Sequence, residues 1–127
     1  MPDPKYKVLV VDDDPMMLRL VSNILALRGH RCEEARNGME ALDKFTASSF
    51  DAVITDIRMP RMDGVELARK LLQLRPALPI IVMTGHHDAS IESEAIYKKA
   101  SDFIYKPFSI TDFLTRFSKV MSDHETP

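Results

Sequence analysis

The 127-residue chain lacks several features that mark specialised classes of protein. Its single cysteine, Cys32, excludes an internal disulfide framework and any zinc site built on two or more cysteines. It has no apolar run near the roughly 18 residues that a membrane span needs, and the start Met1-Pro2-Asp3 is not that of a signal peptide. It has no excess of positive charge, because 17 Lys and Arg face 19 Asp and Glu, so a protein that wraps nucleic acid is not expected. These absences predict a single cytoplasmic domain.

The residues that are present suit a packed α/β protein. Hydrophobic residues make up 45% of the chain and charged residues 28%, so a core is feasible. Continuous apolar runs rich in Val and Ile, at 8–11, 52–54 and 80–83, are typical of strands that are buried on both faces of a parallel sheet. Weaker strands are predicted at 31–35 and 103–105.

Helical periodicity separates these strands. Apolar residues spaced i, i+3, i+4 predict five helices, with stripes at 17–25, 41–45, 65–72, 91–96 and 110–121. Leu20 belongs to the first stripe, and Gly29 is expected to end that helix. The last helix has Ser109 as its expected N-cap, or Thr111 if it starts later.

Five strands that alternate with five helices predict a (βα)5 protein with a right-handed, doubly wound parallel sheet. The domain is expected to span 1–121. The polar residues 122–127 are interpreted as a frayed tail or as the start of a linker.

Polar side chains stand where four of the predicted strands end. In an open α/β sheet the ligand site lies outside the carboxyl ends of the strands, so we expect these side chains to meet there. They are Asp12, Asp13 and Asp14 after the first strand, Asp56 at the end of the third, Thr84 after the fourth and Lys106 after the fifth.

The acids at this edge differ in their expected roles. Asp14 precedes Pro15 and is best explained as the N-cap of the first helix. Asp12 and Asp13 are adjacent acids at the end of a buried strand, where they have little structural use. Crowded carboxylates repel one another, and a hard dication such as Mg2+ removes that repulsion.

The remaining residue types complete a set that suits phosphoryl transfer. Lys106 supplies a compact positive charge for a carboxylate or a phosphoryl oxygen, and Thr84 supplies a hydroxyl donor. Asp56 is the natural nucleophile, because aspartyl phosphate is an established covalent intermediate. Positioning, charge neutralisation and an in-line nucleophile are what this reaction requires.

Four motifs in register resemble the receiver domain of two-component response regulators, of the chemotaxis-regulator type. They are VVDDDP at 10–15, DAVITDIRMPRMDG at 51–64, MTG at 83–85 and FIYKPF at 103–108. Together they cover nearly the whole chain in the order and spacing of that family. The resemblance implies a flavodoxin-like fold with strand order 2-1-3-4-5.

The resemblance also implies roles at the site. Asp56 would accept a phosphoryl group from a phosphohistidine on a sensor kinase or a phosphotransfer protein. Asp13, Asp56 and the main-chain carbonyl of Arg58 would ligate Mg2+, for which Mn2+ is the expected substitute. Asp12 would reach the metal through water, and Lys106 would bridge to the phosphoryl oxygens.

A switch is implied as well. Thr84 would move towards the phosphate, and Phe103 would turn inward as the switch aromatic, although a plain core role for Phe103 is a serious alternative. The signal would be read by a downstream protein on the face of the fourth helix, the fifth strand and the last helix. The Lys106-Pro107 bond is expected to be cis. No contact with nucleic acid or membrane is implied, and a phosphorylation-linked dimer is allowed.

The duration of the signal would depend on self-hydrolysis of the aspartyl phosphate. Arg58 and His86 stand two residues after Asp56 and Thr84, at positions that flank the attacking water in this family. We therefore expect them to modulate dephosphorylation, without a predicted direction.

Three other functions fit these residues less well. A Mg2+-dependent phosphatase of the haloacid dehalogenase type normally has a second acid two residues after its nucleophile, where this chain has Arg58. An FMN binder would have a phosphate loop rich in Ser, Thr and Gly after the first strand, where this chain has three aspartates. A degenerate receiver used only for protein contacts would not need the intact set of Asp12, Asp13, Asp56, Thr84 and Lys106. The cognate kinase, the pathway, the output and the choice between a stand-alone regulator and part of a larger protein stay open.

Overall fold

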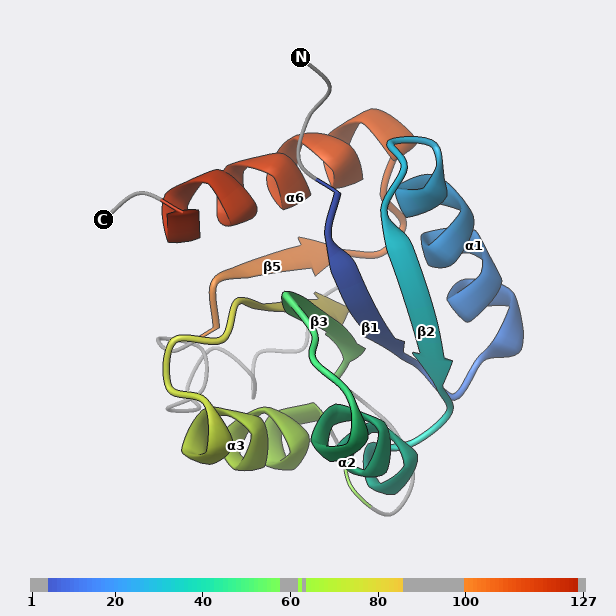
Figure 1. Cartoon of the computed structure of the whole chain (residues 1–127). Helices are drawn as coiled ribbons and strands as arrows, with labels where there is room; N and C mark the ends of the chain where they lie inside the picture. Colours follow the sequence, from blue (N-terminus) through green and yellow to red (C-terminus); the bar gives the residue numbers. More distant parts are fainter. Residues whose placement is uncertain (1–4, 58–61, 63, 86–99, 126–127) are drawn as a thin grey trace.

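The structure is a computed structural model that describes residues 5–57, 62, 64–85 and 100–125. Five parallel strands form one sheet in the order β2-β1-β3-β4-β5 (Figure 1). This confirms the predicted doubly wound, flavodoxin-like sheet. The strands are β1 (Lys7–Val11), β2 (Arg31–Ala35), β3 (Ala52–Asp56), β4 (Ile80–Thr84) and β5 (Asp102–Tyr105).

Helices cover both faces of the sheet. The described helices are α1 (Pro15–Ala26), α2 (Gly38–Ala47), α3 (Gly64–Leu74) and α6 (Ile110–Glu125). Figure 1 shows α1 and α6 on one face and α2 and α3 on the other. The helix predicted around 91–96 lies outside the described residues. Within the described part of the chain, no helix is both long enough and apolar enough to cross a membrane.

The apolar runs of the strands are continuous because each strand supplies both core layers. In β1, Val8 and Val10 are buried among the side chains of α1 and α6, while Leu9 and Val11 are buried on the side of α2 and α3. Full burial of such a side chain contributes about 1.5–3 kcal/mol. A strand with polar residues at alternate positions would lose one of these two layers.

The helix ends follow the predicted local chemistry. Asp14 is the N-cap of α1, where its Oδ1 accepts a hydrogen bond from the Met16 amide at 3.0 Å. Ser109 caps α6, since its Oγ accepts from the Asp112 amide at 3.0 Å. Gly29 has a φ of 81°, in the left-handed region that favours glycine, and it turns the chain from α1 into β2.

Two details differ from the sequence pattern. Leu20 lies on the periodic stripe of α1 but is 44% exposed, because its position faces away from both core layers. Helix α6 continues to Glu125, so the first residues of the expected tail are helical. There the His124 ring lies with Nδ1 2.9 Å from the Val120 carbonyl oxygen and Nε2 3.4 Å from the Ser101 hydroxyl.

Candidate functional site: an acidic cluster at the carboxyl ends of the strands

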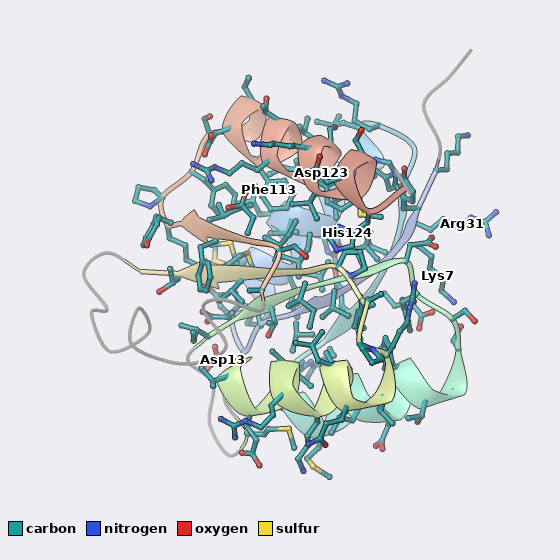
Figure 2. The ribbon with its side chains drawn as sticks, turned by 90° about the vertical axis from the view of Figure 1, so that its left-hand side faces the viewer. Lys7, Asp13, Arg31, Phe113, Asp123 and His124 are labelled. Atoms are coloured by element: carbon teal, nitrogen blue, oxygen red, sulfur yellow. The ribbon has the colours of Figure 1, made fainter. Side chains whose placement is uncertain are left out.

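The candidate site lies at one end of the sheet. Figure 2 shows Asp13 at the end opposite Lys7 and Arg31, which begin β1 and β2. In the register of the neighbouring strands β1 and β3, Val11 pairs with Thr55, so the residues that follow each lie side by side. The Asp12 amide still donates to the Ala35 carbonyl at 3.1 Å, so the sheet hydrogen bonding holds the chain up to the first acid.

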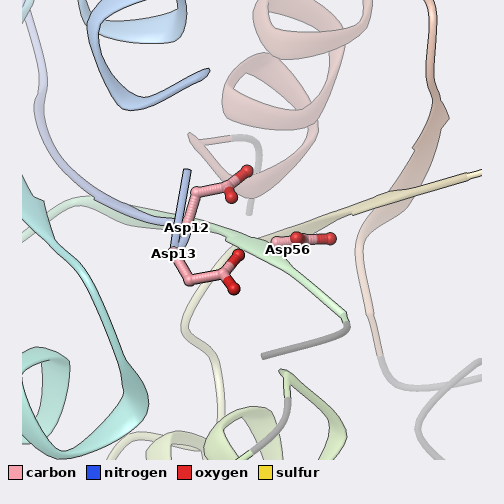
Figure 3. Close-up of side chains that lie close together, drawn as sticks. All are labelled: Asp12, Asp13 and Asp56. Carbon is pink, nitrogen blue, oxygen red and sulfur yellow. The ribbon is translucent and has the colours of Figure 1, made fainter. Parts of the chain in front are cut away.

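Three carboxylates meet at this position. Asp12, Asp13 and Asp56 each offer an oxygen, and these oxygens lie within 4.8 Å of one another (Figure 3). The Asp12 side chain is 1% exposed and that of Asp56 is 13% exposed, while Asp13 is exposed to solvent. The predicted convergence of these acids is therefore observed. An all-oxygen set of carboxylates suits a hard dication, so the cluster fits Mg2+ and could hold it.

Lys106 balances part of this negative charge. Its Nζ lies 3.2 Å from Asp12 Oδ2 and 3.6 Å from Asp56 Oδ2. Its amide donates to the Thr84 carbonyl at 2.7 Å, which holds the end of β5 against β4. The Lys106-Pro107 bond is cis, as the resemblance implied. The ammonium thus lies between the buried carboxylate and the predicted nucleophile.

The buried acid is fully engaged. Besides the contact of Asp12 Oδ2 with Lys106, Asp12 Oδ1 accepts a hydrogen bond from the Asp14 amide at 3.0 Å. A buried carboxylate without such partners would be strongly destabilising. Asp56 and Asp13 are less buried than Asp12, so their oxygens are more accessible to a ligand.

The backbone around Asp56 is closely confined. The next residue, Ile57, donates its amide to the Met83 carbonyl at 3.1 Å and accepts from the Gly64 amide at 2.8 Å. A Cβ at Gly64 would lie 2.3 Å from the Asp56 carbonyl oxygen and 2.7 Å from Ile57 Cα. Only glycine fits there. The motif at 51–64 contains this glycine, but no pattern in the sequence indicated its close packing against Asp56.

Of the remaining predicted residues, Thr84 ends β4 and Phe103 lies in β5, and the other two fall outside the described part of the chain. Thr84 is 1% exposed, and its Oγ1 donates to the Gly85 carbonyl at 3.3 Å. Phe103 is 8% exposed and packs in the core layer on the side of α2 and α3, a placement that fits both the switch and the core interpretation. Arg58 and His86 lie outside the described residues.

Comparisons with known proteins agree with this geometry. The model of the family "Response regulator receiver domain" matches residues 8–118. The chain is 35% identical over 118 residues to "DNA-binding transcriptional regulator NtrC" of Escherichia coli, covering 93% of this chain and 25% of that protein. It is 35% identical over 115 residues to "Response regulator MprA" of Mycobacterium sp., covering 91% of this chain and 50% of that protein.

A solved structure extends the likeness to the fold. The CheY-like response regulator receiver domain protein from Methanospirillum hungatei superposes with a TM-score of 0.89 at 30% identity. The match covers 96% of this chain and 98% of that one. By contrast, the chain spans only 25% and 50% of the length of the two curated relatives.

Proposed function

The chain belongs to the family of response regulator receiver domains, and from this premise we propose that Asp56 accepts a phosphoryl group from a phosphohistidine donor. The donor would be a sensor histidine kinase or a histidine phosphotransfer protein. One observation carries the proposal: Asp56, at the end of β3, offers an oxygen within 4.8 Å of those of two further acids, and its Oδ2 lies 3.6 Å from the Lys106 ammonium. This set supplies a nucleophile, a cation site and a counter-charge in one place.

In the proposed transfer, a carboxylate oxygen of Asp56 forms a bond to phosphorus. The P–N bond to the donor histidine breaks, and its electron pair returns to the ring nitrogen. Lys106, 3.6 Å from Asp56, would hold the phosphoryl oxygens by charge. The Thr84 hydroxyl would turn from the Gly85 carbonyl to donate to the phosphoryl group.

The residues that would hold Mg2+ are Asp13 and Asp56 directly, with the main-chain carbonyl of Arg58, and Asp12 through water. Bound Mg2+ supplies positive charge that offsets the repulsion between carboxylates and phosphoryl oxygens. The parallel register of β1 and β3 supports this assignment, because it brings the ends of the two strands that carry these acids side by side. The burial of Asp12 and its pairing with Lys106 suit an outer role for that carboxylate.

We propose that the new charge of about −1.5 to −2 biases a two-state output face. This face comprises the predicted fourth helix, β5 and α6, and Phe103 would connect it to Thr84. Self-dephosphorylation would end the signal, with Arg58 and His86 as modulators. The receiver domain would occupy 1–121.

Phosphorylation with a small donor tests this function. The protein is incubated with acetyl phosphate, with and without Mg2+, and intact-mass spectrometry counts the phosphoryl groups. We expect one group, present only with Mg2+, lost at alkaline pH and absent in Asp56→Asn. Asp51→Asn is the matched control, because Asp51 is an exposed acid just before β3, at the other end of that strand. Equal labelling of Asp56→Asn and wild type would refute the assignment.

A further inference from the structure

A buried methionine packs against a glycine at the start of α2. Met62, in the connection between β3 and α3, is 5% exposed and belongs to the core layer on the side of α2 and α3. A Cβ at Gly38, the first residue of α2, would lie 2.7 Å from Met62 Sδ and 2.9 Å from its Cβ and Cγ. Real Cβ atoms do not approach this closely. The methionine therefore occupies the space that any other residue at position 38 would need.

The glycine side of this contact is fixed by the cap of its own helix. Asn37 Oδ1 accepts a hydrogen bond from the Glu40 amide at 2.8 Å, and the Asn37 carbonyl accepts from the Ala41 amide at 3.0 Å. These bonds hold the first turn of α2. The position of Gly38 is consequently fixed. A methyl group added there would displace Met62 rather than the helix.

The contact joins the two flanks of the candidate site. Helix α2 follows β2 and Met62 follows β3, and the sheet order places β1 between these strands. Asp12 and Asp13 leave the end of β1, and Asp56 ends β3. Only five residues separate Met62 from Asp56, and the Gly64 amide bond to Ile57 closes the connection on its other side. Met62 stands two residues before Gly64, so a shift of Met62 is passed on through the Gly64 amide to Ile57, the residue after Asp56.

We propose that Gly38 and Met62 act as positioning residues. Their contact, acting through Gly64 and Ile57, holds Asp56 at the separation from Asp13 that divalent-cation binding needs. An ordinary core contact requires only that both residues are buried. Because this contact leaves no room for even one methyl group, it also fixes the distance between Gly38 and Met62. This inference rests on the proposed function, since it concerns the same Mg2+ site.

The test compares Gly38→Ala, Met62→Ala and the double variant with wild type. Mg2+ affinity is measured by isothermal titration calorimetry on the unphosphorylated protein, and stability by urea unfolding in EDTA. Gly29→Ala is the control. Position 29 has a left-handed φ that is unfavourable for alanine, so this variant is destabilised at the α1–β2 turn, at the end of the sheet away from the acids.

We expect Gly38→Ala to weaken Mg2+ binding about tenfold, since a functional site must be held within about 0.5 Å of its productive geometry. Met62→Ala should weaken it as well, and the double variant should bind better than Gly38→Ala alone because the crowding is relieved. Gly29→Ala should lose stability and keep its Mg2+ affinity. Where Gly38→Ala does not fold, Met62→Ala alone decides.

Two results would overturn the inference in different ways. If Gly38→Ala and Met62→Ala are less stable but bind Mg2+ like wild type, the contact is packing only, and the proposed function is unaffected. If wild type itself binds no Mg2+ and takes no phosphoryl group, the proposed function fails and this inference fails with it.

Discussion

Neutralising Asp13 should stabilise the metal-free protein. Its carboxylate has two like-charged neighbours, with oxygens within 4.8 Å of one another. At that separation one pair of unit charges repels by about 3.5 kcal/mol at an effective dielectric constant of 20, and by about 0.9 kcal/mol in water. Because Asp13 is exposed and Lys106 offsets part of the negative charge, we expect Asp13→Asn to raise the free energy of unfolding by about 1–2 kcal/mol.

Urea unfolding in EDTA at low ionic strength measures this gain, and an unchanged m-value shows that the denatured state is not altered. The gain should shrink at high salt, because screening weakens the repulsion in the wild type. Asp43→Asn, at an exposed position of α2, is the control for the change in net charge and should leave stability nearly unchanged.

Mg2+ should remove the advantage of the variant. At a concentration ten times its Kd, a ligand that binds only the native state stabilises it by about 1.4 kcal/mol. Wild type should gain this amount and Asp13→Asn should not, so the two curves converge. The reasoning is refuted if Asp13→Asn is no more stable than wild type in EDTA, or if its advantage persists unchanged in Mg2+.

Three further outcomes are expected. Lys106→Ala removes the positive charge beside Asp12 and Asp56, and should lower the free energy of unfolding in EDTA by about 3 kcal/mol. A decrease below about 1 kcal/mol, measured by urea unfolding, would contradict the importance of this pairing. Asp14→Ala removes the N-cap of α1 and should cost about 1 kcal/mol, while Asp14→Asn should cost little, as thermal unfolding can check. Burial raises the pKa of the Cys32 thiol from 9.0 to about 11, so folded protein should react slowly with iodoacetamide at pH 9 while urea-unfolded protein reacts readily. Because the folded state keeps this proton to higher pH, the thiol favours folding below pH 9 and loses that contribution as the pH rises towards 11. Equal alkylation of folded and unfolded protein at pH 9 would contradict the raised pKa.

Much of the fold was predictable because local chemistry and burial pattern agree. The continuous apolar runs identify strands that are covered on both faces, and Asp14 with Pro15, like Ser109, identifies where a helix begins. Leu20 shows the limit of this reasoning: periodicity places it on a helix stripe, but whether another element covers that part of the stripe depends on the assembled fold.

The site was predictable to the level of its residue types. Acids, a threonine and a lysine at the ends of buried strands indicate one polar edge, since parallel strands bring their carboxyl ends together. The partners of each residue were not predictable, because they depend on distances between segments far apart in the chain. That Lys106 lies closer to Asp12 than to Asp56 is one such result.

The sequence by itself determined the strands, the helix starts and the set of side chains at the site, because each depends on neighbouring residues or on a repeating pattern. Only the tertiary structure decided why positions 38 and 64 are glycine. A Cβ at Gly64 would collide with the backbone of Asp56, and one at Gly38 would collide with Met62. Both requirements come from close approach between segments that the chain brings together only when it folds, and no local pattern records such a distance.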